Sequence, residues 1–415
     1  MGFINIQSVL IYDSTNNIHH FYLEDTNISY VKADVTTKKV QSKVLERNVK
    51  EFDAFIDEKD MIILMGITYD QKLVYFKISN DKIISSVISD KLNPELNDIH
   101  IFGDGEYINV MYSIPVEDID NSRRILQSRY NGDDWDNNEV SEFTQGDSMQ
   151  NEMKIIIEED GKYLGFVEYE DKKSCLSVRG HDGVSWSKDI LKIQKDEEIY
   201  WYDFNKYKNF IEIVYANRID GQFVIRYELY DIGNRKLIEK HDLSSFSNCM
   251  HPVFVSYKGV QWVVWIEMDG IFSCRLLNDR KVIEGPYKWK NSKKSNFMKC
   301  RFSYNNRMIE RELGLKCNCV YALFPEYSLL GIGNLKGNAE YVSIRKKKDK
   351  IGEDKMEHKK EEIKKDGRVE SKKVVEEEGI SIQDKINYLE KRIDNIENYL
   401  KRRSRNSLFG KNKQK

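Results

Sequence analysis

An all-β fold made of about seven repeats is predicted for residues 1–345, and three observations carry that prediction. Short apolar runs of strand length recur about every 45 to 55 residues. Each is followed by a polar turn and a second apolar and aromatic run. A third run then contains one basic residue at a regular interval. Because helical periodicity is lacking and Gly, Asp and Asn turns separate the runs, strands are expected throughout.

The first two runs of each repeat pair along the chain in register. The first runs are INIQSVLIY, EFDAFID, DIHIFGD, EMKIIIEE, EIYWYDF, HPVFVSY and MKCRFSY. The second runs are NIHHFYL, KDMIILM, DGEYINVMY, DGKYLGFVEY, YKNFIEIVY, KGVQWVVW and KCNCVYALF. Seven pairs therefore indicate seven repeats of one structural unit.

A third and a fourth strand complete the unit. The basic residues of the third runs are Lys32, Lys77, Arg129, Arg179, Arg226 and Arg275, separated by 45, 52, 50, 47 and 49 residues. Turn residues and one large apolar side chain follow, at Trp135, Trp186, Leu237 and Trp289. In the seventh repeat LLGIGNL or YVSIRK could supply the third strand. Four strands in about 50 residues, repeated seven times, predict a seven-bladed β-propeller, with six or eight blades as the alternatives.

The turns before three tryptophans carry a resemblance to known propellers. NGDDW, DGVSW and GPYKW end at Trp135, Trp186 and Trp289. A strand, an Asp-Gly turn and a tryptophan in each blade resemble sialidase-like and fucose-lectin-like β-propellers. The turns depart from the Asp box of such proteins, which has one more residue between the acid and the glycine. The resemblance implies that an arginine and an aromatic ring on neighbouring blades hold a sugar.

Two interpretations apply to these repeated residues. The candidate ligand-binding residues are Arg129, Arg179, Arg226, Arg275, Trp135, Trp186 and Trp289. As structural residues, the indoles pack between blades and the arginines pair with nearby carboxylates, which repetition at the blade interval by itself would produce. As functional residues, they form a ring of contacts for a glycan or an anionic ligand. We favour the structural interpretation for most of them.

Signals for catalysis, metals and cofactors are weak. The seven histidines show no metal-ligand spacing such as HExxH, and Cys317 and Cys319 alone do not make a tetrahedral zinc site. A sialidase-like reaction needs a tyrosine nucleophile, arginines and carboxylates that meet in space, and no set of residues stands out for it. We therefore expect a protein that is not an enzyme and that uses neither a metal nor a cofactor.

Charge and hydropathy limit the location and the partners. Residues 346–415 contain 22 Lys and Arg against 15 Asp and Glu, whereas residues 1–345 contain 44 against 53. An acidic body disfavours nucleic acid, whose affinity depends on neutralised phosphates, although the basic tail could touch it. The longest apolar run, Met61–Ile67, is far too short for a membrane span, and no secretory signal is visible. The expectation is a cytoplasmic protein.

The C-terminal part divides into three segments. Residues 346–380 are dominated by charge and contain no aromatic residue, which predicts a flexible linker. Residues 381–403 predict a coiled-coil helix that Ser381 would cap. Residues 404–415 form a basic tail. The seam of the helix repeats every four and three residues through Ile382, Ile386, Leu389, Ile393, Ile396 and Leu400.

The charges beside that seam favour a parallel coiled coil. Lys385 and Arg392 stand at g positions, and Glu390 and Glu397 stand at the e positions five residues later. These pairs of opposite charge meet across a parallel interface, as a homodimer or a homotrimer. The alternative is that the helix docks on the propeller. Together the features predict a non-enzymatic, multivalent binding or scaffold protein with an unknown protein or glycan ligand. The alternative is a lectin or a sialidase-like, glycan-active enzyme.

The seam generates a first testable prediction. Ile393→Asp places a charge in the middle of the predicted interface, where burying it is costly. The full chain should then fall from an oligomer to a monomer in multi-angle light scattering. Asn395→Asp, two residues away and off the seam, is the control. An unchanged mass for Ile393→Asp would contradict the coiled coil.

Overall fold

The computed structural model describes residues 3–343 with short gaps. The gaps are residues 35, 38, 80–81, 92–94, 106, 132–133, 147–152, 159, 197, 246, 269, 291–295, 306 and 312–313. The chain divides into two compact units, Met1–Asp349 and Lys350–Lys415. The predicted linker, coiled coil and basic tail lie outside the described residues.

The described residues form twenty-nine strands and one short helix, α1 (Arg307–Arg311). The first strands of the repeats are β2 (Ser8–Tyr12), β6 (Val49–Ile56), β10 (Asn97–Asp104), β14 (Lys154–Glu158), β18 (Ile199–Tyr207), β22 (Cys249–Tyr257) and β26 (Asn296–Tyr304). The second strands are β3 (Ile18–Glu24), β7 (Ile62–Thr68), β11 (Tyr107–Pro115), β15 (Gly161–Glu170), β19 (Phe210–Ile219), β23 (Val260–Glu267) and β27 (Cys319–Phe324).

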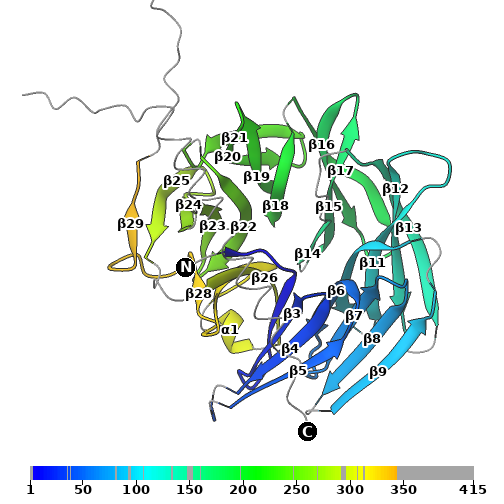
Figure 1. The fold of residues 1–415 in the computed structure, drawn as a ribbon. Coiled ribbons are helices and arrows are strands. Elements are labelled where there is room, and N and C mark those ends of the chain that lie inside the picture. Colours follow the sequence, from blue (N-terminus) through cyan, green and yellow to red (C-terminus); the bar gives the residue numbers. More distant parts are fainter. Residues whose placement is uncertain are drawn as a thin grey trace, which may run out of the picture. The chain divides into compact units, whose positions relative to one another are not determined.

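The third and outer strands lie further from the centre of the ring (Figure 1). The third strands are β4 (Asn27–Ala33), β8 (Leu73–Ser79), β12 (Ser122–Tyr130), β16 (Lys173–His181), β20 (Gln222–Asp231) and β24 (Gly270–Leu277). The outer strands are β5 (Val40–Glu46), β9 (Lys82–Ser89), β13 (Trp135–Thr144), β17 (Trp186–Lys195), β21 (Lys236–Asp242) and β25 (Val282–Trp289). Three short strands are β1 (Phe3–Ile4), β28 (Leu329–Leu330) and β29 (Ala339–Tyr341).

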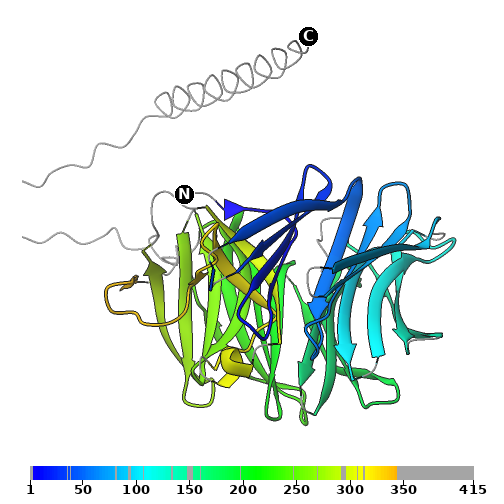
Figure 2. The ribbon, with the colours of Figure 1, turned by 90° about the horizontal axis from the view of Figure 1, so that it is seen from below.

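These strands form a β-propeller of antiparallel sheets arranged around a centre (Figures 1 and 2). Four sheets have four strands in sequence order, from β6, β10, β14 and β18 outward. A fifth runs from β22 to β25 and gains β29 on its outer edge. The six basic residues of the predicted third runs all lie on third strands. The predicted repeat is thus the unit of the fold.

The described residues form six sheets, because the first and last repeats share one. Strand β26 pairs with β2 in parallel, with Val9 opposite Arg301 and Tyr12 opposite Tyr304. Strand β1 also pairs with β26 in parallel. The resulting eight-stranded sheet contains β1–β5 and β26–β28. The predicted third strand of the seventh repeat is reduced to β28, and the YVSIRK segment begins at the end of β29, which joins the sheet of β25 instead.

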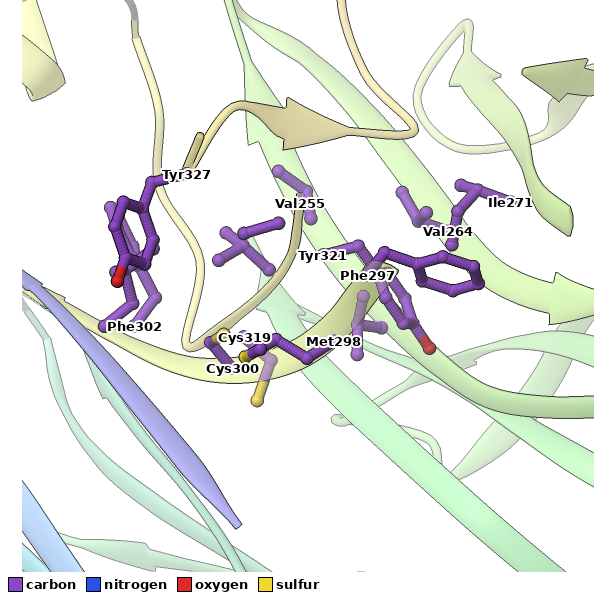
Figure 3. Packing of buried hydrophobic residues seen from close by; sticks show 14 of the residues in the cluster. Val255, Val264, Ile271, Phe297, Met298, Cys300, Phe302, Cys319, Tyr321 and Tyr327 are labelled. Atoms are coloured by element: carbon purple, nitrogen blue, oxygen red, sulfur yellow. The ribbon is translucent and has the colours of Figure 1, made fainter. Parts of the chain in front are cut away.

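The hydrophobic core lies between neighbouring sheets. Continuous burial along second strands such as β7 and β23 explains why these runs lack strict alternation. The largest cluster fills the space between β22–β24 and β26–β27, where Figure 3 shows Val264 and Ile271 near Phe297 and Tyr321. The outer strands are largely exposed, so each sheet is buried near the centre and solvated at its rim.

Buried aspartates link neighbouring sheets. Asp53 on β6 accepts a hydrogen bond from the backbone N–H of Ile101 on β10, at 2.7 Å. Asp203 on β18 accepts one from the N–H of Phe254 on β22, at 2.8 Å. Each carboxylate also accepts the N–H of the residue that follows it. Such bonds satisfy backbone donors that no strand partner reaches, so they hold one sheet to the next.

Removing one of these links should destabilise the propeller. Asp203→Ala leaves the buried N–H of Phe254 without its acceptor, which costs about 1–3 kcal/mol. Urea unfolding followed by tryptophan fluorescence measures the loss. The control is Glu340→Ala, whose exposed ion pair with Lys290 spans 3.2 Å and contributes less than about 1 kcal/mol. Equal stabilities for the two variants would contradict the role given to Asp203.

Candidate functional site

A cavity of about 610 Å³ lies where the first strands converge. Its walls come from the N-terminal segment, β2, β6, β10, β14 and β26, with His251 of β22 and Asn318 before β27. Five phenylalanines line it: Phe3, Phe52, Phe55, Phe102 and Phe302. Its charged lining residues are Lys50, Lys154, Lys299 and Arg301 with Glu51, Asp53 and Asp98. Its size falls within the usual range for small-molecule sites.

Two carboxyl groups on neighbouring sheets stand close together at one side of the cavity. Glu51 on β6 accepts a hydrogen bond from the N–H of Asp98 on β10 through Oε2, at 3.1 Å. Its Oε1 is buried and has no hydrogen-bond partner among the described residues. Burial, and then the charge of Asp98, raises the pKa of Glu51 to about 7. Glu51 therefore exchanges its proton near neutral pH.

A second charged cluster combines Asp53, His100 and Arg301. The guanidinium of Arg301 pairs with the carboxylate of Asp53. Arg301 also donates to the backbone oxygen of Ile101 at 2.9 Å, and its Nη1 lies 3.4 Å from Nδ1 of His100. The Nδ1 atom of His100 is 3.9 Å from Asp53 Oδ2. These contacts between groups of opposite charge join strands β6, β10 and β26 at the cavity.

Lysines provide the positive charge on another part of the wall. Burial raises the pKa of Asp203, and the positive charges of Lys154 and Lys299 oppose that rise. Lys154 lies on β14 and Lys299 on β26, so one acid interacts with two different sheets. Acidic and basic residues both line the cavity, so a ligand there meets hydrogen-bond donors and acceptors.

A serine and a histidine also meet at the wall. The hydroxyl of Ser8 lies 2.8 Å from Nε2 of His20 and donates to the sulfur of Cys300 at 3.1 Å. Nδ1 of His20 is 3.3 Å from the hydroxyl of Tyr327. Burial lowers the pKa of His20 to about 3. An imidazole so weakly basic is a poor general base, so this group serves mainly to satisfy buried polar atoms.

The four predicted arginines do not line the cavity. Arg179 pairs with Asp189 at 3.1 Å and donates to the backbone oxygen of Val140 on the preceding sheet at 2.5 Å. Arg226 pairs with Asp242 at 2.8 Å. Both arginines thus have carboxylate partners within their own sheets.

The other two arginines lie over aromatic rings. Arg275 pairs with Glu284, and its guanidinium lies over Trp262, 5.6 Å from the ring centroid. The guanidinium of Arg129 lies 4.4 Å from the ring centroid of Tyr107, and its Nε has no hydrogen-bond partner among the described residues. Each arginine stays within its own sheet or touches the preceding one.

The three tryptophans also occupy separate places. Trp186 donates through Nε1 to Gln127 on the preceding sheet at 2.8 Å, and Trp289 donates to Ser273 of its own sheet at 2.7 Å. Trp289 is buried, whereas Trp135 is 39% exposed and packs on Tyr130. In the turn before Trp186, Gly183 has φ +100°, which favours glycine, and Asp182 accepts two backbone N–H groups.

The residues of the cavity were missed by the sequence analysis. Glu51, Asp53, Asp98 and His100 all lie in the runs EFDAFID and DIHIFGD. The signal for them was the alternation of acidic and apolar residues in first strands, which converge on the centre of a propeller. The offset between neighbouring sheets decides which polar groups come into contact. The spacing of the repeats along the sequence does not give that offset.

Neither metal ligands nor a membrane-spanning helix occur in the part of the chain that is described. No group of three or more His, Cys, Asp or Glu side chains there is arranged to hold a metal ion. The same residues contain no helix with the length and apolar character needed to cross a bilayer.

Comparisons with known proteins find similarity in solved structures only. No protein-family model matches the sequence, and no curated protein matches it. The structure is similar to a fucose-binding lectin of Aleuria aurantia described as a six-bladed β-propeller, at 10% identity and TM-score 0.42, covering 68% of this chain and 95% of the lectin. It is also similar to an α-L-arabinofuranosidase of Fusarium graminearum, at 13% identity and TM-score 0.41, covering 68% and 94%.

A third similar structure is a polysaccharide lyase, at 8% identity and TM-score 0.42, covering 65% of this chain and 87% of the lyase. The three similar proteins have different activities. At these sequence identities and TM-scores, the similarity gives no information about the ligand of this chain. The propeller assignment rests on its own sheets, described above.

The raised pKa of Glu51 predicts a pH-dependent stability. The folded state holds the proton more tightly than the unfolded chain, so its contribution is full below about pH 4.5 and is lost as the pH rises through about 7. Glu51→Gln removes this loss. The stability of the variant relative to the original chain should rise by up to about 3 kcal/mol between pH 4.5 and 8.

Urea unfolding at several pH values measures that difference. Glu340→Gln, on the exposed strand β29, is the matched control. A difference between the Glu51→Gln variant and the original chain that stays constant with pH would contradict the assignment of Glu51.

Proposed function

We propose that the propeller is a non-enzymatic recognition domain that binds a polar ligand, a carbohydrate being the best match, in its central cavity. The observation that carries the proposal is the lining of that cavity of about 610 Å³, which combines phenylalanine rings with charged groups of both signs. Asp53 and Arg301 compensate each other, and burial and then the charge of Asp98 raise the pKa of Glu51 to about 7. A ligand rich in hydroxyl groups can use these donors and acceptors without carrying a charge itself.

The proposal includes a multivalent assembly. We count β2–β5 and β26–β28 as the first and seventh blades of one ring, since each contains its own antiparallel pair of first and second strands, and the parallel pairing of β26 with β2 supports closure of the ring. Residues 381–403 would join two or three such rings. Several weak sites on one particle then bind a multivalent target more tightly than one site does.

A cavity-filling variant tests the ligand site. Ile157 lines the cavity and is 45% exposed. Ile157→Trp should fill part of the cavity and lower binding on a glycan array at least tenfold. The control is Ile238→Trp on the outer strand β21, at a side chain that is 39% exposed. Equal binding by the two variants would rule out the cavity, and an array without any signal would rule out a carbohydrate ligand.

The arginine and tryptophan series remains a second proposed contact surface, narrowed to Arg129 and Trp135. Arg129 has a buried Nε without a partner among the described residues, and Trp135 is exposed on the next strand of the same sheet. Arg129→Ala and Trp135→Ala on the same array would test it. Arg226→Ala, which removes an arginine already paired with Asp242, is the control for general effects of arginine loss.

A second candidate function is glycoside chemistry in the same cavity. It is favoured by the neighbouring carboxyl groups of Glu51 and Asp98, since glycosidases use one protonated and one ionised carboxyl group. A pKa near 7 suits Glu51 for the role of the acid. Release of p-nitrophenol from aryl glycosides by the original chain, abolished in Glu51→Gln, would replace recognition with catalysis as the function.

A further inference from the structure

Strand β9 has the least protected edge among the outer strands that are described. It pairs with β8 on one side only. Its side chains Ile84, Val87 and Ile88 are 62%, 50% and 40% exposed. The sequence KIISSVIS contains no charged residue after Lys82. A long, exposed and apolar edge of this kind is a template for pairing with another strand.

The other complete outer strands are protected against such pairing. Charged residues occur in the middle of β5, β13, β17 and β21, for example Lys43, Glu139, Lys192 and Glu239. Charges in these positions disfavour the approach of a second strand. Strand β25 contains Pro286 and is covered by β29. The exposure of β9 is therefore a specific feature and not a general property of the rim.

The chain itself demonstrates that an outer strand can accept another strand. Strand β29 lies antiparallel to β25, with Tyr287 opposite Tyr341 and Trp289 opposite Ala339. This pairing adds a fifth strand to a four-stranded sheet. The sheet of β6–β9 has the same order and an outer strand of the same length.

We infer that β9 pairs antiparallel with β9 of a second copy of this chain, joining two propellers at their rims. In such a dimer the twofold axis runs perpendicular to the joined sheet and keeps each side chain on the same face of that sheet. Residues directly opposite each other also share a face. The pairing must therefore be centred on one residue, which lies opposite its own copy. Centring on Ser85 places Ser85 opposite its own copy, and Ile83 of each chain opposite Val87 of the other. The β-bulge near Ile88 lies outside this central stretch.

This register pairs apolar residues on one face of the sheet. Two symmetry-related pairs of Ile83 and Val87 contact on one face, and Ile84 lies opposite Ser86 on the other. Lys82 faces Ile88, so no two charges of the same sign lie opposite each other. Cross-strand apolar pairs of this kind stabilise the pairing of two strands. A contact of one strand is small, so the pairing should be weak and should strengthen when copies are already joined elsewhere.

Disulfide trapping in the full chain tests the register. In a pairing centred on Ser85, the two Cα atoms of Ser85→Cys would be about 4.5–5.5 Å apart, which is within disulfide range. Mild oxidation should give a covalent dimer on a non-reducing gel. Ser42→Cys, at an exposed serine on the outer strand β5, is the matched control. The original chain controls for the six native cysteines, of which five are buried.

A second pair of variants separates pairing from chance collision. Val87→Lys, introduced into the Ser85→Cys variant, places a charge opposite the apolar Ile83 of the second copy. It should reduce the amount of trapped dimer at least fivefold. Val44→Lys on β5 has the same original residue and the same 50% exposure, and it should leave trapping unchanged. If Ser85→Cys forms no more dimer than Ser42→Cys, or if Val87→Lys and Val44→Lys act alike, the inference is wrong.

Discussion

Closure of the ring is the constraint on which the rest of the structure depends. The N-terminal strands β1 and β2 lie parallel to β26, so the two ends of the repeat region share one sheet. Without that sheet, the cluster around Phe297 and Tyr321 would lose one of its walls, and the last repeat would expose an unpaired strand. The pairing of β2 with β26 removes the free edge of these two inner strands.

The same closure brings titratable groups to the centre. First strands meet there at close quarters, and their backbone N–H groups need acceptors that strand pairing does not supply. Asp53 and Asp203 provide them from the neighbouring sheet. Where an acid has a cation beside it, as Asp53 has Arg301, the charge is compensated. Where an acid is buried beside another acid, as Glu51 is beside Asp98, burial first and then the neighbouring charge raise its pKa. The residues that link the sheets and the residues that are candidates for ligand binding are thus both acids of the first strands, and they differ in their surroundings.

Repetition explains why the most visible sequence features and the candidate site are different residues. Arg179 and Arg226 recur because each blade needs similar contacts at the same depth, and both are paired locally. Trp186 and Trp289 likewise donate hydrogen bonds within the framework. The polar residues around the cavity, such as Glu51, His100 and Lys154, instead differ from blade to blade. A search for repeated residues therefore does not find them.

The sequence by itself determined the repeat unit, the order of its strands and the turns between them, because apolar periodicity and turn chemistry act over a few residues. It also carried the heptad seam, which lies outside the described residues and stays a prediction. Only the tertiary structure decided that the described strands form six sheets with β2 and β26 in the same one, since parallel pairing between residues about 290 positions apart leaves no local signal. It likewise decided that Glu51 meets Asp98 and that Arg301 meets Asp53, because the stagger of neighbouring sheets sets which inner side chains come into contact.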